Sequence, residues 1–504
     1  MAATPSLPRP SAAPVEPVRS GATRVPEPGG IPLRTILLGV AGVMLVALGG
    51  TGAGATLKRD PLLADSSLSW IRYGHGQDLA AAVLYLGLGM VIWAWVRLGR
   101  MVLDGHVGSR AVRTAIAAWT LPLLFAPPLF SKDIYSYLAQ GQLALVGLDP
   151  YRVGPAALQS PLSENVSWVW QNTPAPYGPF FMLLAMGVVR ATGAGVIGGV
   201  VLMRLVLAAG LALLCWALPG LARHLGGRPA VALWLAAASP LMLVHLIGGA
   251  HNDMLMVGLL AAGCLFVLER RHVLGIAVVT LAFAVKATAV VALPFLVLVW
   301  ARRLPGSRAA QLGKAIAGGV AVFAAVFAGT TLVSGLDLGW IPALSSSSAI
   351  VNWLSLPSAV GDFAHTAVSA FAHVDSAPFM AVARGLGSLL LVFIAWRQWR
   401  AAEGGGPNAV RRAAITMLAV ALLSPATLPW YFSWALVLGA GLAWTADGLR
   451  AAAFFSTWLL LVTFPDGDTA LYSWGYLVLT VAVSALACAS LTRPDPLKLS
   501  SRYG

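Results

Sequence analysis

The chain has 504 residues, of which 58% are hydrophobic and only 10% are charged. A soluble chain carries about 25% charged and about 45–50% apolar residues, so a string of soluble domains is excluded. The 33 Lys and Arg exceed the 19 Asp and Glu, giving a formal net charge of +14, but so few charges cannot build the dense cationic surface of a nucleic-acid-binding protein.

The first segment, 1–33, is rich in Pro, Ala and Ser and has no apolar period, so we expect a disordered tail. The apolar segment from Leu33 to about Leu57 is long enough to cross a bilayer of about 30 Å. We predict a membrane-embedded domain over 34–492 and a short C-terminal tail over 493–504.

Further apolar segments follow the first one along the chain. They lie near 77–98, 112–130, 197–219, 229–247, 253–268, 272–285, 287–301, 315–334, 378–396, 410–424, 430–445, 450–464 and 475–492. The pattern predicts an all-α polytopic membrane protein with about 13–14 transmembrane helices, in which 272–301 is either one broken helix or a tight pair. Cys215, Cys264 and Cys488 lie far apart in these runs, which favours buried side chains over disulfides or a zinc site.

Three longer stretches interrupt the apolar pattern, at about 131–196, 335–377 and 465–474, and are rich in Trp, Tyr, Pro, Ser and Asp. With a cytoplasmic N-terminus, the cytoplasmic segments hold 24 of the 33 basic residues and 7 of the 19 acidic ones. This distribution follows the positive-inside rule and places both termini in the cytoplasm and the three long loops outside. The segment 179–192 must then lie in the outer interface or re-enter, since it follows a proline cluster and is short.

The first candidate site is Ser131-Lys132-Asp133-Ile134-Tyr135-Ser136-Tyr137, followed by Gln140, at the outer end of the third span. Ionisable residues at the edge of apolar spans are costly, so they point to function by default. Asp133 is a candidate catalytic base; the alternative is that its carboxylate only caps the helix that begins there.

The same loop continues with Asp149-Pro150-Tyr151, Trp168, Trp170 and 173–179 (TPAPYGP), which includes Tyr177. Trp and Tyr on rigid Pro-Gly turns are typical of sugar binding, because aromatic faces stack on sugar rings. An aromatic belt that anchors the loop in the membrane interface explains the composition equally well.

Two further clusters carry charge. His251-Asn252-Asp253 lies at the predicted outer end of the fifth span, after two glycines that permit close approach. Lys286 interrupts an apolar run, so it should face an anion, either a phosphate or an Asp or Glu partner. Arg204 and Arg384 also fall within spans, where we expect structural pairs or snorkelling side chains, with phosphate contact as the lesser alternative.

The weakest candidates are 424–431, which ends in Trp430 and Tyr431, and 352–357 (NWLSLP), which contains Trp353. Proline-kinked helix ends often only turn the chain. No zinc-protease, P-loop or nucleophile-elbow motif is present in a usable context.

Taken together, 131–141 (SKDIYSYLAQG), Asp149-Pro150-Tyr151 and 173–179 resemble the polyprenol-phosphomannose-dependent α-1,6-mannosyltransferases of actinobacteria, of the MptA/MptB type. The segments 251–253 and 352–357 are also similar to that family, and the resemblance covers most of 34–492. It implies a GT-C glycosyltransferase of the plasma membrane that extends the α-1,6-mannan of lipomannan on the extracytoplasmic side. The commoner GT-C layout has its large catalytic loop after the first span, whereas the loop here follows the third.

The resemblance implies Asp133 as the base of an inverting displacement, with a polyprenyl-phosphate mannose as donor and a lipid-anchored α-1,6-mannan as acceptor, among membrane lipids and without nucleic acid. Lys286 and His251 are then expected to bind the donor phosphate. Sugar contacts are expected from Tyr135, Tyr137, Gln140, Tyr177, Asn252, Asp253, Trp353, Trp430 and Tyr431. Neither a cofactor nor a metal is required, although a divalent metal is not excluded. The alternatives are a transporter or flippase of lipid-linked sugar, which should show related halves, and a non-catalytic scaffold.

Overall fold

The computed structural model describes residues 30–63 and 65–493. The two expected tails, 1–33 and 493–504, therefore lie outside the described residues except for their inner ends. The described residues form helices and isolated bridges but no β-strand.

The first half of the chain contains three long helices, a group of short ones, and a fourth long helix. These are α1 (Leu33–Ala53), η1 (Ser69–Arg72), α2 (His75–Leu103), α3 (Ser109–Phe125), α4 (Asp133–Leu145), η2 (Pro155–Ala157), α5 (Pro161–Glu164), η3 (Trp168–Trp170), α6 (Pro179–Thr192), α7 (Val196–Leu225), α8 (Pro229–Ala232), η4 (Leu233–Ala237) and η5 (Leu241–Gly248). The second half continues with α9 (Asp253–Leu268), α10 (His272–Val285), η6 (Ala287–Ala292), α11 (Leu293–Ala301), α12 (Arg308–Ser334), α13 (Trp340–Ala343), η7 (Leu344–Ala349), α14 (Leu356–Ser369), α15 (Ser376–Ala401), α16 (Gly406–Leu423), η8 (Pro429–Phe432), α17 (Ser433–Gly439), α18 (Ala446–Leu461) and α19 (Trp474–Thr492).

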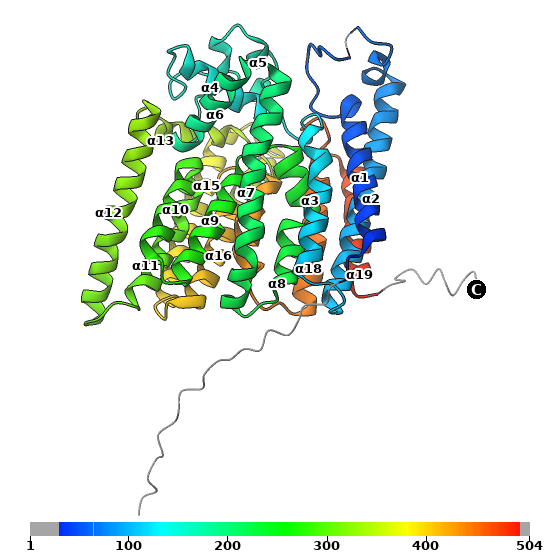
Figure 1. Ribbon diagram of the computed structural model, residues 1–504. Coiled ribbons are helices and arrows are strands. Elements are labelled where there is room, and N and C mark those ends of the chain that lie inside the picture. Colours follow the sequence, from blue (N-terminus) through cyan, green and yellow to red (C-terminus); the bar gives the residue numbers. More distant parts are fainter. Residues whose placement is uncertain (1–29, 64, 494–504) are drawn as a thin grey trace, which may run out of the picture.

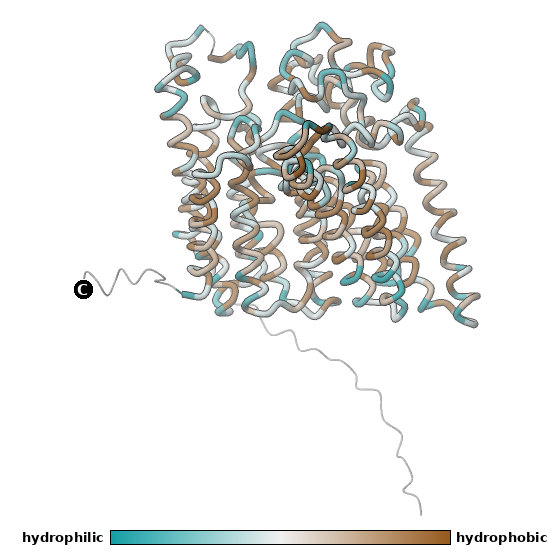
Figure 2. Tube along the Cα trace, turned by 180° about the vertical axis from the view of Figure 1, so that it is seen from behind, coloured by the Kyte–Doolittle hydropathy of each residue, from teal (hydrophilic) through white to brown (hydrophobic). Residues whose placement is uncertain are grey.

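The long helices stand side by side in one bundle, and α4 and α5 form a cap over one end of it, which we call the upper end (Figure 1). The described chain starts and finishes at the opposite, lower end, because α1 begins there and α19 ends there. Apolar residues dominate the middle of the bundle, and polar residues gather toward its two ends (Figure 2). This banding is what a bilayer requires of a spanning protein.

Among the described residues, six helices are long and apolar enough to cross a membrane, and the bent pair Pro229–Ala237 and Leu241–Gly248 brings the number to as many as seven. Helices such as α9 and α10 are apolar but shorter, with 16 and 14 residues. The prediction of an all-α, multi-pass membrane protein is confirmed. The short helix α6 lies beside α4 at the upper end, consistent with the expectation that 179–192 does not span.

Several predicted boundaries were wrong. The third span ends at Phe125 rather than 130, and 126–132 is irregular. The fifth is not one helix, because η4 and η5 are π-helices that meet at a 49° bend next to Pro240. The twelfth is a short 3-10 helix, η8, followed by the seven-residue α17. The outer loop 335–377 carries a helix of its own, α14.

Arg204 of α7 is fully buried and donates to the backbone carbonyls of Ala126, Pro127 and Gly248. The guanidinium does not snorkel to solvent; it is paired structurally, with carbonyl groups at helix ends. Its role is structural: it ties the end of α3 to the end of η5. The two segments that leave these ends, 126–132 and 249–252, are thereby fixed side by side.

Candidate functional site

Asp133 is the first residue of α4, and the chain before it is held by local contacts. Phe130 adopts φ +59 and donates its N–H to Pro465 O at 2.8 Å. The Asp133 N–H bonds Ser131 Oγ at 3.0 Å. The N-cap is Lys132, so Asp133 is not the cap that the alternative interpretation required, although the helix N-terminus still favours its negative charge.

His251 belongs to the segment 249–252, which Arg204 fixes beside 126–132, and its side chain contacts Asp133. Its Nδ1 lies 3.3 Å from Asp133 Oδ2, and its ring stacks on Trp430 with the centroids 3.7 Å apart. The ring N–H is not aligned on the carboxylate, because neither ring nitrogen completes a hydrogen bond within the described chain. The His251 side chain is fully buried behind Asp133. The structure therefore places it as a neighbour of the carboxylate rather than on the surface where a donor phosphate would lie.

The pKa of Asp133 lies below its ordinary value. Burial acts to raise it, but the contact and the electrostatic interaction with His251 and the positive charge of Lys286 outweigh burial, with a contribution from the Trp170 indole. Asp133 is thus held as a carboxylate, the form that accepts a proton.

Lys286 stands where the predicted span 272–301 breaks into two helices. Its backbone is extended (φ −148, ψ 129), so α10 ends and the side chain turns inward. The Nζ bonds both carboxylate oxygens of Asp253, at 2.7 and 2.9 Å, and lies over the ring of Tyr431, 4.7 Å from its centroid. Asp253 Oδ1 also accepts from Trp434 Nε1 at 2.6 Å. The expected acidic partner is present.

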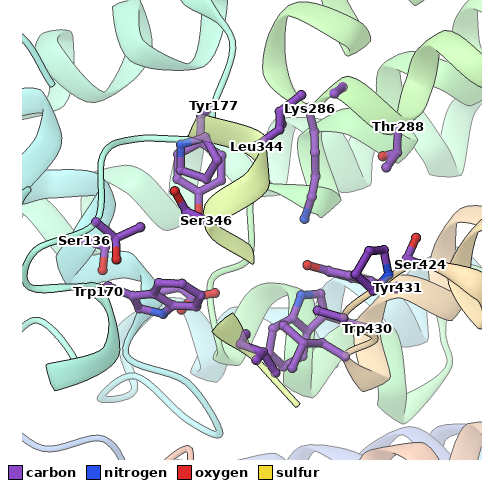
Figure 3. A pocket seen from close by; sticks show the side chains of 18 of the residues that line it. Ser136, Trp170, Tyr177, Lys286, Thr288, Leu344, Ser346, Ser424, Trp430 and Tyr431 are labelled. Atoms are coloured by element: carbon purple, nitrogen blue, oxygen red, sulfur yellow. The ribbon is translucent and has the colours of Figure 1, made fainter. Parts of the chain in front are cut away.

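The ion pair does not withdraw Lys286 from solvent. Its side chain remains 15% exposed and lines a cavity of about 170 Å³, whereas Asp253 is fully buried behind it. Figure 3 shows Lys286 entering this cavity from one side, with Trp170 and Ser136 across from it and Tyr431 below. Asp133 lines the same cavity, which we call the central cavity.

Polar atoms without partners surround the central cavity. Ser136 Oγ, Gln140 Oε1 and Thr288 Oγ1 have no hydrogen-bond partner among the described residues. Buried polar groups left unpaired are costly, so these atoms are suited to bind the hydroxyl groups of a ligand.

Aromatic residues form the remaining wall between Asp133 and Lys286. Tyr137 of α4 meets Tyr177 edge to face, with the centroids 5.1 Å apart. Gly178 follows, and a Cβ there would lie 2.4 Å from Ala284 O, so only glycine lets this loop approach the end of α10 so closely. The close contact places Tyr177 beside Lys286.

Four predicted sugar-binding residues lie outside the lining of the central cavity. Tyr135 is turned away, and its hydroxyl donates to Ala55 O at 2.9 Å. Trp353 donates to Leu471 O at 2.8 Å and packs on Trp458. Asn252 and Asp253 are fully buried. None of these four can therefore contact a sugar bound in the central cavity, and Trp353 lines a separate apolar cavity instead. Tyr137, Gln140, Tyr177, Trp430 and Tyr431 do line the cavity.

The weak motifs 352–357 and 424–431 form one hydrogen-bonded unit. Ser355 Oγ donates to Ser424 O at 2.6 Å, and Ser358 Oγ donates to Pro425 O at 2.7 Å. Arg384 donates in turn to Ser358 Oγ at 3.1 Å, a structural contact rather than a phosphate site. This unit holds the segment 424–431 against the cavity.

Sequence reasoning missed Thr288, Ser346 and Trp434, which also line the cavity. Thr288 and Trp434 stand close to Lys286 and Tyr431 in the sequence, whereas Ser346 lies outside the identified motifs; only the folded chain shows which of these residues face inward. Within residues 30–63 and 65–493, no three His, Cys, Asp or Glu side chains converge as metal ligands. The expectation that no metal is needed stays a prediction. Chemically, the cavity joins a proton-accepting carboxylate to a cation that can stabilise an anion.

Comparisons with known proteins point to one family. The MptA/MptB family model described as alpha-(1->6)-mannopyranosyltransferase, N-terminal domain, matches residues 36–302, and the MptB C-terminal domain matches residues 357–493. Alpha-(1->6)-mannopyranosyltransferase A of Mycobacterium tuberculosis is 42% identical over 473 residues, covering 93% of this chain and 91% of that protein. The protein of the same name from Corynebacterium glutamicum is 33% identical over 470 residues, covering 88% and 94%. Among solved structures, apo ArnT from Cupriavidus metallidurans matches at 16% identity with a TM-score of 0.37, covering 75% of this chain and 74% of that one.

Proposed function

The chain belongs to the alpha-(1->6)-mannopyranosyltransferase family and is a multi-pass membrane mannosyltransferase; from this premise we propose that it moves mannose from a polyprenyl-phosphate mannose to the 6-hydroxyl of an α-1,6-mannan acceptor of the lipomannan type. The observation that carries the proposal is the central cavity, which brings the Asp133 carboxylate and the Lys286 ammonium together.

The proposed reaction is an inverting displacement. The acceptor O6 attacks the anomeric carbon of a β-linked mannosyl phosphate while Asp133 takes the proton from that hydroxyl. The new O6–C1 bond forms as the bond between C1 and the phosphate oxygen breaks, and the electron pair leaves with the polyprenyl phosphate. A glycosidase needs a second carboxylate to protonate its leaving oxygen. Phosphate leaves as an anion, so one base and one cation suffice.

Lys286 is the group that we assign to the departing phosphate. It lines the cavity, and Asp253 and the two rings of Tyr431 and Trp434 hold its Nζ in place. A phosphate entering the cavity would share the ammonium with Asp253. His251 acts instead as a positioning residue, because it contacts the base and not the cavity.

We further propose that the upper end of the bundle faces the outside of the cell. Helix α4, which lines the cavity with Asp133 and Tyr137, lies at that end, and the described chain begins and ends at the other (Figure 1). Most of the basic residues belong to the segments expected at the lower end, which the positive-inside rule assigns to the cytoplasm.

The direct test uses the purified full chain in lipid vesicles, with labelled polyprenyl-phosphate mannose and a short α-1,6-mannoside. We expect a product that is one mannose longer and is cleaved by an α-1,6-specific mannosidase. Vesicles without protein and reactions without acceptor are the controls. Movement of intact donor between the leaflets without any transfer would establish the flippase alternative and refute the proposal.

A further inference from the structure

A second cavity, of about 530 Å³, meets the central cavity at Asp133. The two share the walls formed by Asp133, Trp170 and Trp430. The second cavity has its own lining of polar and aromatic residues: Lys58, Lys132, Trp168, Asp466, Asp468 and Thr469. Lys286 does not line it, so a group that arrives through the second cavity reaches Asp133 without passing the cation.

The walls of the second cavity are fixed by contacts between distant segments. Lys58 N donates to Asn165 Oδ1 at 2.8 Å, joining the segment after α1 to the loop before η3. Gly467 adopts φ +99, and a Cβ there would lie 3.1 Å from the Ser131 Cα. The turn 464–468 therefore presses directly on the residues that lead into Asp133. These contacts hold the walls of the second cavity in a defined position.

The lining favours a neutral ligand with many hydroxyl groups. Two ammonium groups, from Lys58 and Lys132, and three carboxylates, from Asp133, Asp466 and Asp468, stand around it. The cavity therefore offers hydrogen-bond donors and acceptors and lacks the purely positive lining that would select an anion. Trp168 is 85% exposed at its rim and presents an indole face for a sugar ring.

We propose that the second cavity binds the acceptor as a chain of several mannose residues, with the terminal 6-hydroxyl delivered to Asp133. The inference rests on the proposed function: in an inverting displacement, nucleophile and leaving group occupy opposite faces of the anomeric carbon. With the donor phosphate at Lys286 and the acceptor in the second cavity, the two groups approach the anomeric carbon from different cavities, as this reaction requires. The second cavity is also about three times as large as the central one, so it holds more than the terminal sugar.

The kinetic test compares acceptors of one, two and four α-1,6-linked mannoses at saturating donor. We expect the acceptor KM of the wild-type chain to fall as the acceptor lengthens. Trp168→Ala should raise the KM of the tetramannoside by about fivefold to tenfold and leave the donor KM unchanged. Trp474→Ala is the matched control, because Trp474 is also exposed (69%) and lines neither cavity. A raised donor KM with an unchanged acceptor KM in Trp168→Ala overturns the assignment.

A second measurement is independent of catalysis. A cysteine introduced by Asp468→Cys is labelled with a maleimide in the full chain, with and without tetramannoside, and the labelling of the parent chain is subtracted. Tyr472→Cys is the control, since Tyr472 is 51% exposed in the same segment but outside both cavities. We expect the mannoside to protect position 468 and not position 472.

The outcomes separate the two proposals. Protection in a chain that transfers no mannose leaves the acceptor site standing and removes the proposed function. Transfer without protection, at mannoside concentrations that saturate the reaction, overturns the acceptor site alone.

Discussion

At the scale of single residues, the proposed chemistry depends on two buried side chains that contact Asp133 and Lys286. His251 is pressed between Trp430 and Asp133, and Asp253 supports Lys286 from behind. Both supporting residues are fully buried. Neither needs to touch a substrate to affect the rate, because each controls the position or the charge of a group that does.

The first prediction concerns the pH dependence of transfer. Asp133 must be ionised to act, and its pKa is lowered by His251 among other groups, so the wild-type rate persists as the pH falls into the ordinary carboxyl range. Removing the imidazole raises that pKa, so His251→Gln should lose activity at a higher pH on acidification. The groups that remain near Asp133 are Lys286, Lys132, Asp253, Tyr137, Tyr177 and Tyr431.

The measurement is kcat/KM for the donor against pH, with the exposed His75→Gln as control. A variant that is slower at every pH but has the wild-type acid limb would show that His251 only supports the fold.

At the scale of helices, the site is built from breaks in them. Lys286 lies where α10 stops, Asp253 where α9 starts, and Asp133 where α4 starts. A continuous helix through 272–301 would point Lys286 along a buried face. Because the helix breaks at this residue, the ion pair between Lys286 and Asp253 links the end of α10 to the start of α9. The ammonium group of Lys286 also lines the central cavity.

The ion pair between Lys286 and Asp253 gives a stability prediction. Lys286→Met leaves a fully buried carboxylate without its partner, which typically destabilises by about 3–5 kcal/mol. Adding Asp253→Asn removes the uncompensated charge, so the double variant should unfold at a higher temperature than Lys286→Met alone. Thermal unfolding in detergent measures both. A double variant no more stable than the single one would show that the pair is not coupled. The donor KM should rise in either variant, while the acceptor KM should not.

The close approach of α6 to α10 gives a second prediction at this scale. Gly178→Ala places a methyl group against Ala284 O, a conflict that costs about 1–3 kcal/mol and moves Tyr177 away from Lys286. We expect a lower unfolding temperature and slower transfer. Gly187→Ala lies inside α6, the helix that Gly178 caps, and has nothing within 4 Å of its Cβ, so it should lower neither the unfolding temperature nor the transfer rate. Equal behaviour of the two variants would contradict the packing argument.

At the scale of the whole molecule, the excess of basic residues is a topology signal rather than a binding surface. The two described chain ends lie at the lower end of the bundle, where the Arg-rich segments are also expected. Helix α4, whose Asp133 lines both cavities, lies at the upper end. A cysteine introduced at Asp468 should therefore react with a membrane-impermeant maleimide in intact cells. One introduced at Gly404, between α15 and α16, should react only after lysis. The reverse pattern would place the active site in the cytoplasm.

Charged residues of the membrane domain can be identified from the sequence, because a charge within an apolar segment costs free energy and is therefore rare. Asp133 and Lys286 are found in this way. His251 and Asp253 are found too, but not as the partners of Asp133 and Lys286. Pairing depends on which helices meet: Asp253 is 33 residues from Lys286, and Trp434 is 181 residues from Asp253. Apolar periodicity also fails to give helix lengths. The seven-residue α17 and the π-helices of 233–248 have the same composition as full spans.

The central claim is that Asp133 is the base of mannosyl transfer, and Asp133→Asn tests it most directly. The variant keeps the size and polarity of the side chain but cannot accept the proton of the acceptor hydroxyl. In vesicles with labelled polyprenyl-phosphate mannose and α-1,6-tetramannoside, at matched amounts of folded protein, we expect kcat to fall by about 10²–10⁴-fold. Asp78→Asn, an exposed position at the start of α2, should transfer at the wild-type rate. Wild-type transfer by Asp133→Asn would contradict the account.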